Sequence, residues 1–148
     1  MSVPSTSMGP CGLYCGSCPI FQARFFPELR TRLAKELHCR EEQVTCNGCR
    51  ELTDNCWGRA CKIRFCAKNR GYEYCSQCPD LPCHRLRKLS MGYRDLPERQ
   101  LRELEQMETG EFMKLMGSRW TCPCGYPISA HTLRCIKCGK EAEELIPS

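Results

Sequence analysis

The stretch CGLYCGSCPIF, residues Cys11–Phe21, places three thiols in the pattern Cys-x3-Cys-x2-Cys. Closely spaced thiols of this kind present several sulfur ligands to one metal centre. Gly12 and Gly16 allow tight turns between the thiols, and Pro19 stiffens the chain after the last of them. The stretch therefore predicts a three-thiol half-site, whose fourth ligand must come from elsewhere in the chain.

Cysteine is unusually abundant, with 16 among 148 residues. Such a proportion marks either a disulfide scaffold or a metal-thiolate protein. The first residues, MSVPSTSMGP, lack the basic segment and apolar run of a signal peptide, and no stretch reaches the roughly 18 apolar residues that span a membrane. We therefore expect a cytoplasmic protein with no membrane segment, in which reducing conditions leave clustered thiols available for metal.

The cysteines also divide the chain. Residues 11–83 hold twelve of them, residues 84–121 hold none, and residues 122–138 hold four. This distribution predicts four parts: a flexible N-terminus (1–10), a Cys-rich metal-binding domain (11–90), a helical connector (91–118) and a zinc ribbon (119–148).

Three segments have the pattern of helices, and no long alternating strand pattern is present. The first helix is expected over 27–39 with Pro27 in its first turn, and the second over 59–70 with Gly71 as its C-cap. The third is expected over 96–116, interrupted at Thr109-Gly110. The predicted fold class is a small metal-stabilised protein of mostly short helices and metal knuckles with little strand, ending in a zinc-ribbon hairpin.

The stretch WTCPCGYPISAHTLRCIKCGK carries the most specific metal signal. Its four cysteines are Cys122, Cys124, Cys135 and Cys138. Two turns that each present two sulfurs, and that are each followed by a glycine, meet the needs of tetrahedral coordination. The segment between them can form a short strand, which predicts a hairpin.

This stretch resembles the zinc-ribbon and rubredoxin-like family over about 20 residues. The resemblance implies a closed four-cysteine site for zinc, or less often iron, that stabilises the fold or binds a partner and does not catalyse. The first turn, C-P-C, is one residue shorter than the usual CxxC. His131 is a spare candidate ligand, and an exposed hairpin histidine is the other interpretation.

The twelve N-terminal cysteines are enough for three four-thiolate sites, and the sequence leaves their grouping open. CNGC and CSQC are the best-formed pair of turns, and we expect them to share one site. Cys39, Cys83, His38 or His84 could complete the other groups, and a buried free thiol is the alternative for Cys39. Cys61 and Cys66 lie about 140° apart on a regular helix, so one of them is expected in the preceding turn or at another site. The candidate N-terminal ligands are Cys11, Cys15, Cys18, Cys46, Cys49, Cys56, Cys61, Cys66, Cys75, Cys78 and Cys83.

CGLYCGSCPIF, CNGC and the run CKIRFCAKNRGYEYCSQCPDLPC, in this order, resemble an uncharacterised cysteine-rich family of prokaryotes, domain-of-unknown-function family 3795. The resemblance covers roughly residues 9–90 and leaves out the C-terminal ribbon. It implies a small metal-binding domain, frequent in anaerobes, with no established activity.

These residues suggest four candidate functions. Radical-SAM enzymes share the opening spacing, but they need a barrel of about 200 residues, and Ser17 replaces the aromatic residue usual before the last cysteine. A multi-site zinc protein with a structural or adaptor role is favoured. The alternative is an iron–sulfur protein with a [4Fe-4S] cluster in the N-terminal domain and zinc in the ribbon, since Cys18-Pro19 and Cys78-Pro79 are similar to the Cys-Pro of ferredoxins. Enzyme activity is not favoured, because a reactive thiol lacks its usual βαβ context.

A protein partner is expected, and a nucleic-acid partner is the further possibility considered. The formal net charge is +5, but four zinc sites with four thiolates each would change it to about −3. One local patch combines cations with aromatic residues and carries no acid. In the other interpretation its cations offset neighbouring thiolates. The cations are Arg59, Lys62, Arg64, Lys68 and Arg70.

Overall fold

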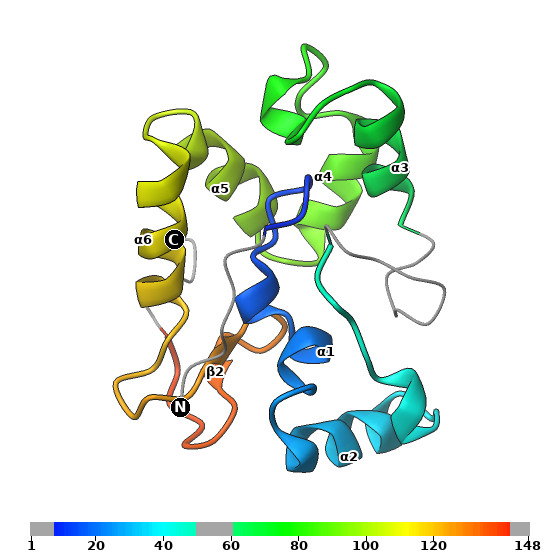
Figure 1. Cartoon of the computed structure of the whole chain (residues 1–148), viewed down its shortest axis with the longest axis vertical. Helices are drawn as coiled ribbons and strands as arrows, with labels where there is room; N and C mark the ends of the chain where they lie inside the picture. The colour runs from blue at the N-terminus through cyan, green and yellow to red at the C-terminus, as the bar shows by residue number, and fades with distance from the viewer. Residues whose placement is uncertain (1–7, 50–60, 143–148) are drawn as a thin grey trace.

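The computed structural model describes residues 8–49 and 61–142, which form short helices and a small sheet (Figure 1). The helices are α1 (Pro19–Gln22), α2 (Pro27–Glu36), α3 (Lys62–Asn69), α4 (His84–Met91), α5 (Leu96–Leu104) and α6 (Thr109–Arg119). Single 3-10 turns are η1 (Cys15–Ser17), η2 (Glu41–Gln43) and η3 (Cys75–Gln77). Strands β1 (Ile128–Ser129) and β2 (Arg134–Cys135) pair antiparallel, with Ile128 opposite Cys135. The predicted predominance of short helices with little strand is confirmed.

The expected helices are present with shifted ends. α2 begins at Pro27, and α3 is followed by Gly71 at a φ of +77°, a left-handed conformation that glycine adopts readily. The third expected helix is divided into α5 and α6. The division falls just before Thr109, because the Glu108 side chain accepts a hydrogen bond from the Gly110 amide (3.1 Å) and caps a new helix. The sequence patterns had not predicted α1 or α4.

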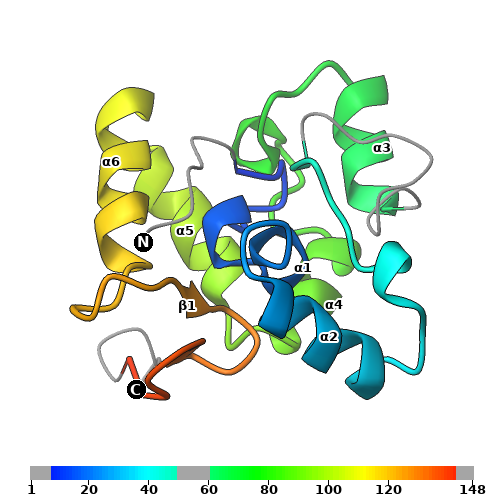
Figure 2. The same ribbon diagram turned by 60° about the horizontal axis from the view of Figure 1, so that its bottom comes forward.

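The first cysteine turn lies in the middle of the molecule. Residues 8–23 run between α6 on one side and α3 on the other in both ribbon views (Figures 1 and 2). The main hydrophobic cluster includes Tyr14 from this turn, Leu101 and Phe112 from the connector, and Leu133 from the hairpin. Residues from each of the three cysteine-defined parts therefore share one buried cluster, and the division of the chain into domains stays a prediction.

A buried glutamine joins the first cysteine turn to the C-terminal part. The Gln100 side chain is fully buried, and its Nε2 donates a hydrogen bond to the Gly12 carbonyl oxygen at 2.6 Å. Its Oε1 accepts a hydrogen bond from Trp120 Nε1 at 3.0 Å. Because Trp120 directly follows α6 and leads into Cys122, this amide fixes where the C-terminal cysteines begin relative to the turn around Gly12.

A second buried glutamine attaches β1 to the same region. Gln22 Nε2 donates hydrogen bonds to the carbonyl oxygens of Gly16 (2.8 Å) and Ile128 (3.0 Å). The Ala130 amide donates to the Ser17 carbonyl oxygen at 2.8 Å. Both ends of β1 are thus held by η1 and α1, which positions the hairpin that carries Cys135.

Within the part of the chain that the structure describes, no helix combines the length and the apolar character needed to cross a membrane.

Gly12 allows the close approach of α5. Its φ is +94°, and a Cβ atom added there would overlap the Pro97 carbonyl oxygen and lie 2.9 Å from Leu101 Cγ. Gly71 has a similar φ of +77°, but an added Cβ would meet nothing within 4 Å. Substitutions at these two glycines therefore distinguish the effect of backbone strain from the effect of steric overlap.

We expect Gly71→Ala to lower the free energy of unfolding by about 1 kcal/mol, through backbone strain alone. Gly12→Ala should lower it by about 3 kcal/mol or more, because overlap with the backbone of α5 adds to the same strain. Urea unfolding of the two metal-loaded variants measures the difference. Equal losses in both variants would show that α5 does not press against the turn.

Candidate metal centre

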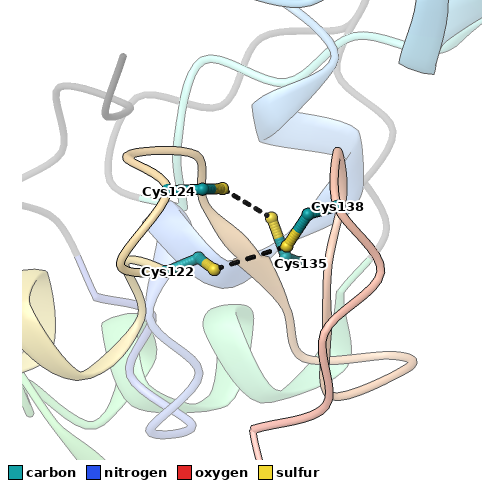
Figure 3. Close-up of side chains that lie close together, drawn as sticks. All are labelled: Cys122, Cys124, Cys135 and Cys138. Carbon is teal, nitrogen blue, oxygen red and sulfur yellow. Dashed lines mark hydrogen bonds between the residues drawn. The ribbon is translucent and has the colours of Figure 1, made fainter.

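The four C-terminal cysteines converge on one point (Figure 3). Their sulfur atoms all lie within 4.8 Å of one another. The Sγ atoms of Cys122 and Cys138 are 3.7 Å apart, and those of Cys124 and Cys135 are 3.5 Å apart. Cys122 and Cys135 are buried, whereas Cys124 and Cys138 are exposed, so the group lies at the protein surface with one side covered.

Local hydrogen bonds shape the two turns that carry these thiols. In the first turn the Cys122 amide donates to the Tyr126 carbonyl oxygen, and the Gly125 amide donates to the Cys122 carbonyl oxygen, both at 2.8 Å. In the second turn the Gly139 amide donates to the Cys135 carbonyl oxygen at 3.2 Å. Gly125 and Gly139 have φ values of +92° and +74°, so the glycine after each pair provides the backbone reversal that the sequence predicted.

Backbone amides also point at the sulfurs. The Lys137 amide lies 3.4 Å from Cys135 Sγ and donates to it. The Tyr126 amide, together with the thiols of Cys135 and Cys122, lowers the pKa of Cys124 to about 7. For Cys122 the amide of Cys124 acts in the same direction, but burial and hydrogen bonds with the neighbouring thiols outweigh it and raise the pKa to about 12. The short C-P-C turn therefore still aims an amide at each of its two sulfurs.

His131 lies outside this thiol group. Its Nε2 is 2.9 Å from the hydroxyl oxygen of Tyr93, and the two rings meet edge to face with centroids 5.2 Å apart. The side chain is exposed, and partial burial lowers its pKa. The interpretation as an exposed hairpin histidine fits this position.

Cysteines of the first turn meet the CNGC turn. The Cys49 amide lies 3.4 Å from Cys15 Sγ, and a Cβ added to Gly9 would lie 3.2 Å from Cys49 Sγ and 3.4 Å from Cys11 Sγ. A hydrogen bond with the Cys15 thiol, followed by burial and the nearby charges of Cys15, Cys11 and Cys18, raises the pKa of Cys49. The first turn therefore has CNGC as its neighbour.

The CSQC turn has other neighbours. Cys66, Cys75, Cys78 and Cys83 line one cavity of about 40 Å³. Burial raises the pKa of Cys75 to about 11, with further contributions from the charges of Cys83, Cys66, Cys78 and Cys61. CNGC lies beside Cys15, CSQC shares a cavity with Cys66 and Cys83, and Cys11 interacts with thiols of both turns, so the single site expected for CNGC and CSQC stays a prediction. CSQC packs against α3 and the start of α4, and it also meets the chain just before Cys11, because the Cys75 amide donates a hydrogen bond to the Pro10 carbonyl oxygen at 2.8 Å.

The remaining candidate ligands are placed as follows. Cys61 is the N-cap of α3 with extended backbone, and Cys66 lies inside the helix, as the helix geometry of the pair required. Cys39 packs against the smaller hydrophobic cluster around Val44. Cys56 and Arg59 lie outside the described residues. Across residues 8–49 and 61–142, the C-terminal group is the one set of three or more candidate ligand atoms within 4.8 Å of one another.

Arg70, a cation of the predicted basic patch, contacts a thiol. Its Nη1 donates to Cys78 Sγ and to the Asp80 carboxylate, each at 3.3 Å. This geometry fits the interpretation in which the cations offset neighbouring thiolates.

Sequence reasoning did not identify Gln22 and Gln100 as residues that position the cysteines. Their sequence surroundings are those of ordinary polar helix residues, and only burial shows their role.

Fold and site together define a small helical, cysteine-rich protein with a four-thiol group that could hold a metal ion. A family model described as "Protein of unknown function (DUF3795)" matches residues 7–88, which is more than half of the chain. The chain belongs to this family, and the resemblance expected from its cysteine blocks is confirmed. No curated protein and no solved structure matches the chain.

The thiols of the C-P-C turn should differ in reactivity when metal is absent. We expect the alkylation rate of Cys124 to rise from about pH 6 to about pH 8, because a pKa of about 7 places its conversion to the reactive thiolate in this interval. Cys122, with a pKa of about 12, should remain almost unlabelled. Mass spectrometry of iodoacetamide-treated, metal-free protein measures both sites in one sample. Faster labelling of Cys122 than of Cys124 would contradict the amide pattern described above.

Proposed function

We propose that this chain is a zinc-binding protein whose C-terminal group holds one zinc ion in a closed zinc-ribbon site. The sulfur separations carry this proposal. Zinc–sulfur bonds of about 2.3 Å at tetrahedral angles hold the sulfurs about 3.8 Å apart. The separations of 3.7 Å and 3.5 Å in the structure are close to that value, so one ion fits with little movement of the turns.

The proposed role of this zinc is structural. Each strand of the hairpin has two residues, and an isolated two-stranded hairpin is marginal in water even when longer. Four thiolates fill the coordination sphere of zinc and leave no position for substrate or activated water. A closed site of this kind stabilises the hairpin. The surface of the hairpin then remains available to bind a partner.

The adaptor role includes a protein partner in the cytoplasm, where thiols stay reduced. Nucleic acid is the weaker choice of partner. Arg70 is already engaged by Cys78 and Asp80, which reduces the positive charge that the patch around α3 offers to phosphate. In this proposal, residues 11–90 form the metal-binding domain, residues 91–118 the helical connector and residues 119–148 the zinc ribbon.

An iron–sulfur protein is the second candidate function, favoured by one observation about the N-terminal cysteines. Four of them line one cavity, and among the described residues no three N-terminal thiols lie within 4.8 Å of one another. In a [4Fe-4S] cluster each thiolate binds a different iron atom, so the sulfurs lie farther apart than around a single ion. A cluster in the N-terminal domain would coexist with zinc in the ribbon.

Cys138→Ser tests the zinc site against Cys39→Ser as the matched control. We expect Cys138→Ser to bind about one zinc ion less per chain than the unsubstituted protein, and Cys39→Ser to lose none. The free energy of unfolding of Cys138→Ser should fall by several kcal/mol, since apparent zinc binding in zinc-finger peptides reaches about 10–16 kcal/mol. Elemental analysis and urea unfolding measure the two effects.

Unchanged zinc content in Cys138→Ser would overturn the zinc proposal. The visible spectrum of protein purified without oxygen tests the second candidate function, that of an iron–sulfur protein. Absorbance near 400 nm together with labile sulfide supports a cluster, and colourless protein with zinc alone contradicts it.

A further inference from the structure

A cavity beside α3 collects four cysteines from three separate elements. Cys66 comes from α3, Cys75 and Cys78 from η3 and the residue after it, and Cys83 from the N-cap of α4. All four line the same cavity of about 40 Å³, which is larger than one water molecule requires. The arrangement brings together thiols separated by up to 17 positions in sequence.

The rest of the cavity lining is mostly apolar. Ile63 and Ala67 come from α3, Leu86 from α4, and Leu81 from the segment before α4. A water-poor wall around soft sulfur ligands suits a metal–thiolate centre, because it limits solvent access and strengthens the charge interactions inside. Four thiols without a metal would gain little from such an arrangement.

The sulfur spacing is compatible with a centre larger than one ion. A single tetrahedral zinc needs sulfurs about 3.8 Å apart, and the C-terminal group has this spacing. Among the described residues, the cysteines of the cavity do not gather within 4.8 Å of one another as that group does. A polynuclear cluster accommodates sulfurs that lie farther apart, because each thiolate binds a different metal atom.

The charges around the cavity suit an anionic metal–thiolate centre. An oxidised [4Fe-4S] core carries two positive charges, so its complex with four thiolates is a dianion. The Arg70 guanidinium lies 3.3 Å from Cys78 Sγ and donates a hydrogen bond to it, and Arg85 lines the same cavity. The hydrogen bond from Arg70, which also pairs with Asp80 of the same cavity, would stabilise the Cys78 thiolate.

We propose that Cys66, Cys75, Cys78 and Cys83 bind a [4Fe-4S] cluster in this cavity, with Arg70 as hydrogen-bond donor to the Cys78 thiolate. The ligand set excludes Cys61, a near neighbour that caps α3 and does not line the cavity. This inference rests on the second candidate function and assigns its ligands. It is independent of the zinc ion proposed for the C-terminal group.

The unsubstituted protein provides the first test. The full chain is reconstituted without oxygen with ferrous iron and sulfide, treated briefly with iodoacetamide, and analysed by mass spectrometry. We expect the four cavity cysteines to be protected relative to the metal-free protein, while Cys39 and Cys61 are labelled equally in both samples. Labelling of any cavity cysteine at its metal-free rate, or protection of Cys61, would overturn the ligand set.

Variants provide the second test. Cys75→Ser combined with Cys78→Ser should lose about four iron and four sulfide per chain, and Cys61→Ser should lose none. Zinc is counted in the same samples. Unchanged iron in the double variant overturns this proposal and leaves the zinc proposal intact, whereas unsubstituted protein that binds four iron but no zinc overturns the zinc proposal alone. If the double variant also loses zinc through misfolding, the labelling of the unsubstituted protein decides whether the four cavity cysteines are the cluster ligands.

Discussion

The hydrogen bonds of one buried amide determine how the parts of this protein fit together. Gln100 on α5 donates to the Gly12 carbonyl oxygen and accepts from the Trp120 indole, and it is fully buried. Without it, a buried carbonyl and a buried indole N–H would lack partners, each at a cost of about 1–3 kcal/mol. The first cysteine turn can therefore lie in the centre of the molecule with its polar backbone satisfied.

The buried glutamines and the main hydrophobic cluster together place the cysteines. Gln22 holds β1 against the first turn, so the hairpin that carries Cys135 is attached at two points to the segment that carries Cys15 and Cys18. The thiols of the first turn and those of the hairpin are therefore held in fixed positions relative to one another. The C-terminal sulfurs are close enough for one ion, while those beside α3 surround a cavity. Metal binding would add to the stability of a fold with short elements.

Spacing within a turn was predictable from the sequence, because it depends on a few neighbouring residues. Cys122 and Cys124, like Cys135 and Cys138, are separated by too little chain to lie far apart, and the glycine after each pair reverses the backbone. The start of α2 at Pro27 and the left-handed Gly71 follow from equally local rules. The family, too, was recognisable from the order of the cysteine blocks.

The sequence by itself therefore determined a cysteine-rich helical chain and the two turns of its C-terminal thiol group. Only the tertiary structure decided which distant thiols meet. Cys49 reaches Cys15 across 34 positions, and CSQC adjoins α3. The physical reason is that such meetings depend on which buried surfaces pack and which buried amides find partners. Residues such as Gln22 and Gln100 carry no sign of that role until the chain has folded.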